Sequence, residues 1–197
     1  MHEELSPLGF TLISVALDRS VDDARPWIER AAPTHPALVD TEWRVADLYN
    51  VVNVPTVVWI DEDGRIVRPN DVFYATDTYR AMTRIDSAEV LGRVRRWVRE
   101  GVVGLDADEA ASLQTVATEE HQLARAEFGL ARWLVAQQRG DAAEPHFVRA
   151  GELAPHDFAI RRGQMRIRGI DPMGPEFVAM VRDWAAAGNP YYRPLPK

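Results

Sequence analysis

The strand signals of this 197-residue chain are confined to its first third, and this limits the folds that it can adopt. A nearly continuous apolar run over residues 11–17 is typical of a strand in a parallel sheet. Residues 37–39 predict a second short strand, and Thr56–Ile60, which is β-branched and aromatic, predicts the clearest one. Residues 106–188 hold only helical patterns. We therefore expect a strand-containing domain over 1–104 and a helical tail over 105–197.

The order of the elements in the first region indicates an α/β fold. Asp61–Gly64 separates the strand at 56–60 from a further strand at 65–68, which predicts an antiparallel hairpin. Ser20 and Asp86 are good helix N-caps, each followed by an apolar pattern of helical period. Strands that alternate with helices and then end in a hairpin predict a mixed sheet with flanking helices.

The tail predicts a helical hairpin at about 120–155 that resembles one tetratricopeptide repeat. The positions that match the packing residues of this 34-residue repeat are Leu130, Ala131, Leu134, Ala143, Phe147, Ala150 and Pro155. One interpretation is a groove that binds a peptide or protein partner. The other is a tail that covers the first domain or mediates self-association, and we favour it because repeat grooves usually need at least three repeats.

Composition excludes several kinds of chemistry. The chain has no cysteine, which removes disulfides, thiolate nucleophiles and cysteine metal sites. A net charge of −7 argues against nucleic acid as a partner. The five histidines show no metal-ligand spacing, so we expect no metal and no cofactor. There is no apolar run long enough to span a membrane, and Met1–Pro7 is not a signal peptide, so the chain as written is expected to be cytoplasmic.

A small basic cluster lies near the C-terminal end of the tail. It consists of Arg161, Arg162, Arg166 and Arg168. Such a cluster could hold an acidic group, but more often it is a solvated helix face that pairs with nearby acids.

Three pieces of the first region stand out by their order and spacing: Gly9–Asp18, then Leu38–Thr41 with Val45–Val51, then Val54–Val67. Together they resemble the TlpA/ResA-like branch of the thioredoxin superfamily, which borders the AhpC/TSA peroxiredoxins. The resemblance implies a thioredoxin-like fold and the activity of a thiol-disulfide oxidoreductase or peroxiredoxin-like enzyme. It also implies a cis peptide bond before Pro55, with Val54, Pro55 and Thr56 on the substrate-binding face.

The chain departs from that family in its first part. The redox Cys-x-x-Cys of the family and the central strand before it precede the segment that matches residues 12–17, where only about ten residues stand here. The resemblance therefore implies that two strands lack a common neighbour, and that they either pair with each other or accept another chain between them. With no catalytic cysteine, the chain as given is expected to be inactive, and whether it is an enzyme stays open.

Two explanations of this departure follow. In one, the start is mis-assigned, and the natural oxidoreductase begins upstream and carries the cysteines. In the other, the chain is a complete, redox-silent interaction protein. That protein would bind a partner through its thioredoxin-like surface or helical tail, or self-associate through the exposed sheet or the tail.

Overall fold

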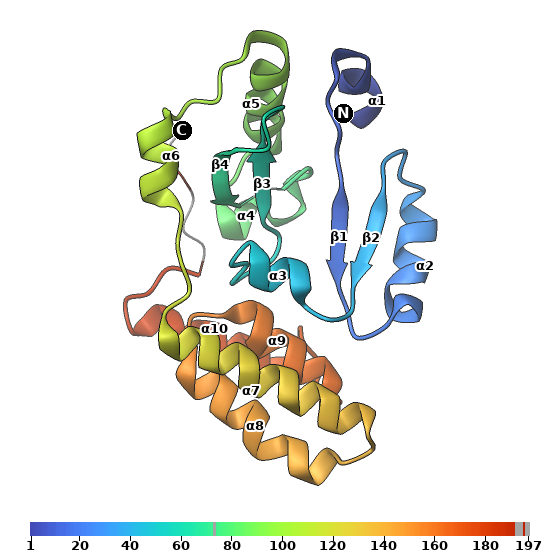
Figure 1. The fold of residues 1–197 in the computed structure, drawn as a ribbon, viewed down its shortest axis with the longest axis vertical. Helices are drawn as coiled ribbons and strands as arrows, with labels where there is room; N and C mark the ends of the chain where they lie inside the picture. The colour runs from blue at the N-terminus through green and yellow to red at the C-terminus, as the bar shows by residue number, and fades with distance from the viewer. Residues whose placement is uncertain (73, 192–194, 196–197) are drawn as a thin grey trace.

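The computed structural model describes residues 1–72, 74–191 and 195, so residues 192–194, 196 and 197 of the expected tail lie outside it. Strands and helices alternate in the first half of the chain, and helices alone make up the second half (Figure 1). This confirms an α/β architecture followed by helices. The helices are α1 (His2–Leu5), α2 (Val21–Ala31), α3 (Arg44–Leu48), α4 (Arg80–Thr83), α5 (Ser87–Glu100), α6 (Ala107–Leu113), α7 (Glu119–Ala136), α8 (Gly140–Leu153), α9 (Phe158–Ile167) and α10 (Pro175–Ala186).

The strands form two separate sheets instead of the one mixed sheet that the sequence predicts. Strand β1 (Ser14–Leu17) pairs in parallel with β2 (Ala37–Asp40), and β3 (Val57–Ile60) pairs antiparallel with β4 (Ile66–Asp71). The inner strands β1 and β3 face each other in Figure 1, and no described strand joins them. The alternative in which these two strands pair with each other is therefore wrong for the described chain.

Local sequence explains how the helices of the first region begin. The Ser20 hydroxyl accepts a hydrogen bond from the Asp23 N–H, and the Asp86 carboxylate accepts from the N–H groups of Ala88 and Glu89, as the sequence predicts. Helix α3 begins differently, because its first N–H groups donate to the Asp40 carboxylate at the end of β2, at 3.0 and 2.8 Å. Strand β2 thus positions α3 directly.

The expected helical hairpin is present as α7 and α8, and it forms the main hydrophobic core. Its buried side chains come largely from α7, α8 and α9, with Trp43 and Ala46 of the first region among them. A smaller core holds Leu5, Trp59 and Val94, where the Trp59 and Trp97 rings stack with centroids 4.9 Å apart. The larger core crosses the domain boundary expected near residue 104.

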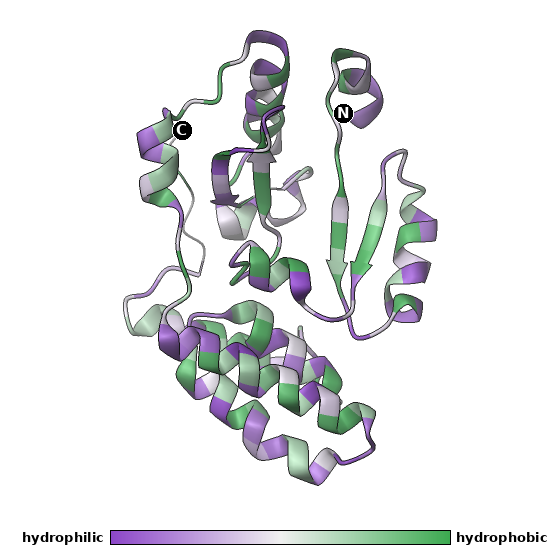
Figure 2. Cartoon of the chain, in the orientation of Figure 1, coloured by the Kyte–Doolittle hydropathy of each residue, from purple (hydrophilic) through white to green (hydrophobic). Residues whose placement is uncertain are grey.

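The two-stranded sheets leave apolar surface exposed. Figure 2 shows that β1, β2 and β3 are largely hydrophobic, yet β1 has no fully buried residue. Ile13, just before β1, and Leu38 in β2 are 55% and 53% exposed. A narrow sheet buries less side-chain surface than a wide one, since each strand has a neighbour on one side only.

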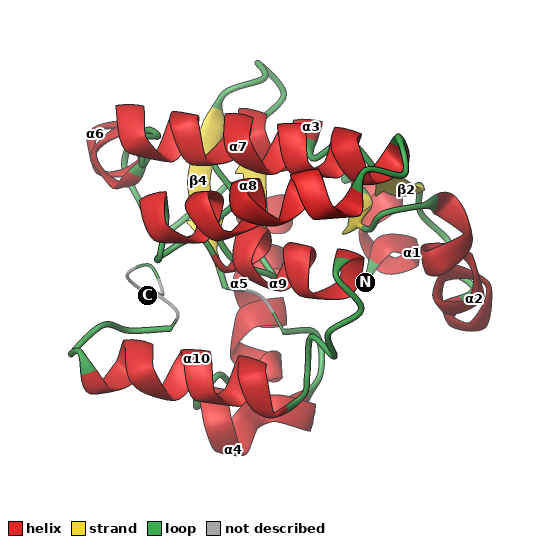
Figure 3. Ribbon diagram, turned by 90° about the horizontal axis from the view of Figure 1, so that it is seen from below, coloured by secondary structure: helices red, strands yellow, loops and turns green. Residues whose placement is uncertain are grey.

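The helices of the tail are layered. Figure 3 shows α7, α8 and α9 side by side, with α10 set apart from them. Helix α10 has no fully buried residue. Among the described residues, none of the helices is both long and apolar enough to cross a membrane.

Candidate functional site

The segment Val54–Thr56 is the candidate site that the resemblance indicates. It connects α3 to β3, and the Val54–Pro55 peptide bond is cis, as the resemblance implies. The preceding residue, Asn53, is 6% exposed, and its side-chain oxygen accepts a hydrogen bond from the Val54 N–H at 2.9 Å. The side chains of Val54, Pro55 and Thr56 are partly buried. Their role in substrate binding stays a prediction.

The helical tail covers this segment. The Val52 carbonyl accepts hydrogen bonds from the N–H groups of Phe158 and Ala159, at 2.7 and 3.1 Å, so the first turn of α9 is docked on the chain just before the cis bond. The Asn53 side-chain NH₂ donates to the Tyr191 carbonyl at 2.9 Å. Two backbone groups beside Pro55, the Val52 carbonyl and the Val54 N–H, are therefore already hydrogen-bonded within this chain.

Close packing joins the same helix to the first region. A Cβ built on Gly163 would lie 2.8 Å from the Trp43 ring and 3.3 Å from the Phe128 ring, so any larger residue here would have to displace the Trp43 ring. The Trp43 and Phe128 rings pack edge to face, with centroids 5.2 Å apart. The Arg132 guanidinium lies over the Trp43 ring and donates to the Thr41 carbonyl.

Burial at this junction shifts the pKa of several groups. It raises the pKa of the Asp47 carboxyl, against the opposing effect of Arg125, whose guanidinium lies 3.2 Å away. It lowers the pKa of the Arg132 guanidinium and raises that of the Tyr191 phenol. Arg132 and Tyr191 are thus partly withdrawn from water where the tail meets the first region, whereas the Asp47 side chain stays 49% exposed.

An ion pair links the residue that follows β1 to α9. Asp18 and Arg166 form an ion pair at 2.7 Å, at the edge of a small cavity of about 120 Å³ that Val54 and Gly163 also line. Two of the four arginines of the basic cluster therefore pair with acids: Arg166 with Asp18, and Arg168 with Glu144. Arg162 stacks on the Phe177 ring at 4.6 Å.

The segment around Pro55 carries no thiol, because the chain has no cysteine. The described residues contain no group of three or more potential metal ligands. A buried His121–Asp157 pair, 2.7 Å apart, lies at the starts of α7 and α9, where Asp157 also caps α9 through the Ile160 N–H. Both side chains are almost fully buried, so they fasten two helices together.

Sequence reasoning missed two residues that connect the tail to this segment. Asn53 and Gly163 make close contacts with it, and neither stands in a motif. Only the tertiary structure brings them to Val54 and Pro55. A comparison with protein-family models, with curated proteins and with solved structures finds no match to this chain.

Proposed function

We propose that this chain is a thioredoxin-like protein of the thiol-disulfide oxidoreductase and peroxiredoxin-like family, redox-silent in the form given. The observation that carries the proposal is the arrangement of its sheets. A parallel pair, β1 and β2, and an antiparallel hairpin, β3 and β4, present their inner edges to each other. Helix α2 follows β1, and β4 is followed by the short α4 and then by α5. One further strand between β1 and β3 would unite them in a single mixed sheet.

The physical argument concerns the inner edges. A strand edge carries a row of N–H and C=O groups that need partners, and apolar strands with unfilled edges are rare. The apolar character of β1 and β3 fits strands that are central in a sheet. We infer that an additional strand, from whatever source, completes the sheet, and that residues Val54, Pro55 and Thr56 lie on the face where a family member would bind its substrate.

A second candidate function is a redox-silent interaction protein, and one observation favours it. Helix α7 carries Leu123, Leu130 and Trp133 on one face, and all three are between 41% and 54% exposed. A surface of this kind suits a protein partner or a second copy of the chain. The opposite face of α7 is sealed by the core, so the tail would act through this outer surface.

The activity test is insulin reduction with dithiothreitol. We expect the rate with the purified chain to equal that of buffer, because no thiol can attack the insulin disulfides. A thioredoxin assayed in parallel shows that the conditions are suitable. Turnover above buffer would contradict the redox-silent reading.

The source of the further strand is tested by the intact mass and peptide map of the protein from its source cells. A mass clearly above 22.2 kDa, with additional peptides that hold two cysteines, would supply both the strand and the redox centre. A mass that matches this chain would favour the interaction protein. Light scattering would then show whether Trp133→Glu dissociates a dimer.

A further inference from the structure

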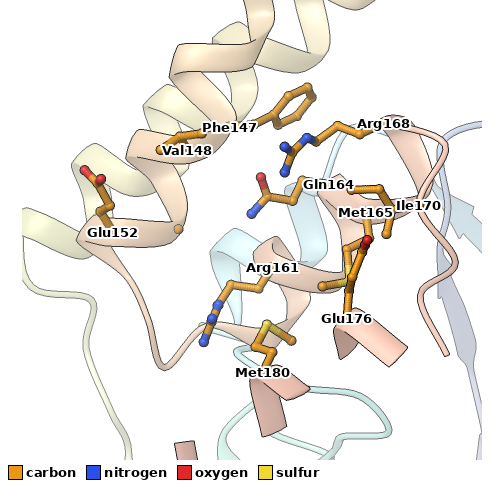
Figure 4. A pocket seen from close by; sticks show the side chains of 11 residues that line it. Phe147, Val148, Glu152, Arg161, Gln164, Met165, Arg168, Ile170, Glu176 and Met180 are labelled. Carbon is orange, nitrogen blue, oxygen red and sulfur yellow. The ribbon is translucent and has the colours of Figure 1, made fainter. Parts of the chain in front are cut away.

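The helical tail leaves two surfaces without a partner, a cavity and the outer face of α7. The cavity, of about 550 Å³, lies between α8, α9 and α10 (Figure 4). Its polar lining groups do not converge on one ligand group, since the Arg161 side chain points away from the Gln164 amide and Arg168 is paired with Glu144. The outer face of α7 is better defined, because its exposed apolar side chains follow one regular pattern.

Four residues of α7 form this pattern, and we refer to them as the α7 stripe. They are Leu123, Ala126, Leu130 and Trp133, spaced by three, four and three residues. This is the spacing of the a and d positions of a coiled coil, which lie on one side of a helix. Leu123, Leu130 and Trp133 are 47%, 41% and 54% exposed, and Ala126 is exposed too. Other residues of α7 face the main core, so the stripe is free to pack against something else.

A second α7 helix that runs antiparallel fits the stripe in size. Positions 126 and 130 lie equally far from Phe128, and so do positions 123 and 133. A two-fold axis at that level places the small Ala126 opposite Leu130 of the second copy, and Leu123 opposite Trp133. In a parallel pair, Ala126 would face Ala126 and Trp133 would face Trp133, which leaves a gap at one level and crowds another. The side chains therefore favour the antiparallel order.

Charges at the two ends of α7 favour the same order. Glu119 and Glu120 stand in its first turn, Arg139 follows its last turn, and none of the three forms an ion pair with a described residue. Antiparallel helices bring the first turn of each copy to the end of the other, where Arg139 meets the two acids. A parallel pair would gather four acids at one end. Glu127, beside the stripe near the axis, is already bound to His146 of its own chain at 2.6 Å.

We propose that two copies of this chain associate through the α7 stripe as an antiparallel, two-fold symmetric dimer. A self-complementary face of this kind closes after two copies. Residues 123–133 span only about 15 Å of helix, and the interface is smaller than the roughly 1,600 Å² of a typical stable complex, so we expect a reversible dimer with a micromolar Kd. The proposal rests on the second candidate function, the interaction protein, and names its partner as another copy of the chain.

Sedimentation velocity tests the dimer on the full chain. Between about 1 µM and about 1 mM protein, the mass should rise from 22.2 kDa toward twice that value. Trp133→Glu should raise the Kd at least about tenfold, because it places a charge among apolar side chains at the position of a large aromatic contact. Trp27→Glu in α2 is the matched control: Trp27 is 63% exposed and lies outside the stripe, so the Kd should not change. Circular dichroism reports whether both variants stay folded.

Disulfide trapping tests the antiparallel order, and the absence of natural cysteine makes it specific. Ala126→Cys chains are mixed with isotope-labelled Leu130→Cys chains and then oxidised. The antiparallel order brings position 126 of one copy next to position 130 of the other, so the mixed disulfide should dominate, since a disulfide needs Cα atoms within about 7 Å. Disulfides between two identical variants would instead indicate a parallel pair and contradict the proposed order.

A charge exchange tests the contact at the helix ends. Arg139→Glu should weaken the dimer about two- to tenfold at low salt, and adding Glu119→Lys should restore most of the affinity. Failure of the second change to restore it would overturn the proposed contact.

The outcomes separate this inference from the functions on which it borders. A monomer at every concentration, or equal weakening by the two tryptophan variants, would overturn the dimer. A monomer that binds a different protein through Trp133 would overturn the dimer and keep the interaction function. The insulin assay tests the redox-silent reading alone and is independent of these results.

Discussion

The two halves of this molecule differ in where their backbone groups find hydrogen-bond partners. The helices α7, α8 and α9 satisfy their backbone groups internally and use their side chains to build the main core, where Phe147 is 1% exposed. The strands depend on lateral neighbours, and β1 and β3 each have one. Leu38 in β2 is 53% exposed, although it is as apolar as the core residues.

This difference shows where the stability of the chain as given resides. A helical hairpin closes on itself, whereas a strand region without a central neighbour leaves part of its hydrophobic surface in water. Helix α9 contacts Val52 by hydrogen bonds and Trp43 by packing, and these contacts hold part of the strand region against the helices. The strand region is therefore expected to open first.

The largest expected effect is that of Phe147→Ala in α8. Removing this buried ring should lower the free energy of unfolding by about 3–5 kcal/mol, through lost burial and the cavity left behind. The matched change in the strand region is Val15→Ala in β1, which should cost only about 1 kcal/mol because the side chain is partly exposed. Urea unfolding followed by circular dichroism measures both. Equal losses would show that the strand region is as well packed as the helices.

A smaller effect on stability is expected from alanine substitutions at two glycines that lie in helices, Gly163 in α9 and Gly92 in α5. Gly163→Ala should destabilise by about 1–3 kcal/mol, because the added Cβ meets the Trp43 ring at 2.8 Å. Gly92→Ala in α5 has open space around it and should stabilise by about 0.5–1 kcal/mol through helix propensity. Thermal unfolding of the two variants would sharpen the comparison. Stabilisation by both would mean that α9 does not dock on Trp43.

The smallest effect concerns His35, in the loop between α2 and β2. Burial, together with the charge of nearby His2, lowers the pKa of His35 below its usual 6.5. As the pH falls below about 6.5 the unfolded chain takes up a proton before the folded chain does, so the free energy of unfolding decreases until the folded pKa is passed. His35→Gln should remove this slope.

Titration of the His35 ring by NMR gives the pKa directly. A value at or above 6.5 would contradict the expected direction. So would a His35→Gln variant whose stability keeps the same dependence on pH in this window.

Much of the helical architecture could be predicted from local sequence. The caps at Ser20 and Asp86 and the hairpin turn ending at Gly64 act through neighbouring backbone groups, and the structure confirms each. The first turn of α3 is bound by Asp40, a residue of the preceding strand. The candidate segment Val54–Thr56 was identified by resemblance, and its functional role stays a prediction.

The sequence by itself indicated the four strands and the longer helices, because hydrophobic period and capping act over a few residues. It did not indicate the short helices α4 and α6. Only the tertiary structure decided how the strands pair and what covers them. Sheet neighbours and the docking of α9 on Val52 join residues far apart along the chain, and contacts of that kind leave no periodic signal. For the same reason, the cavity lined by Gln164 and Arg161 depends on how α8, α9 and α10 pack together, which the sequence does not indicate.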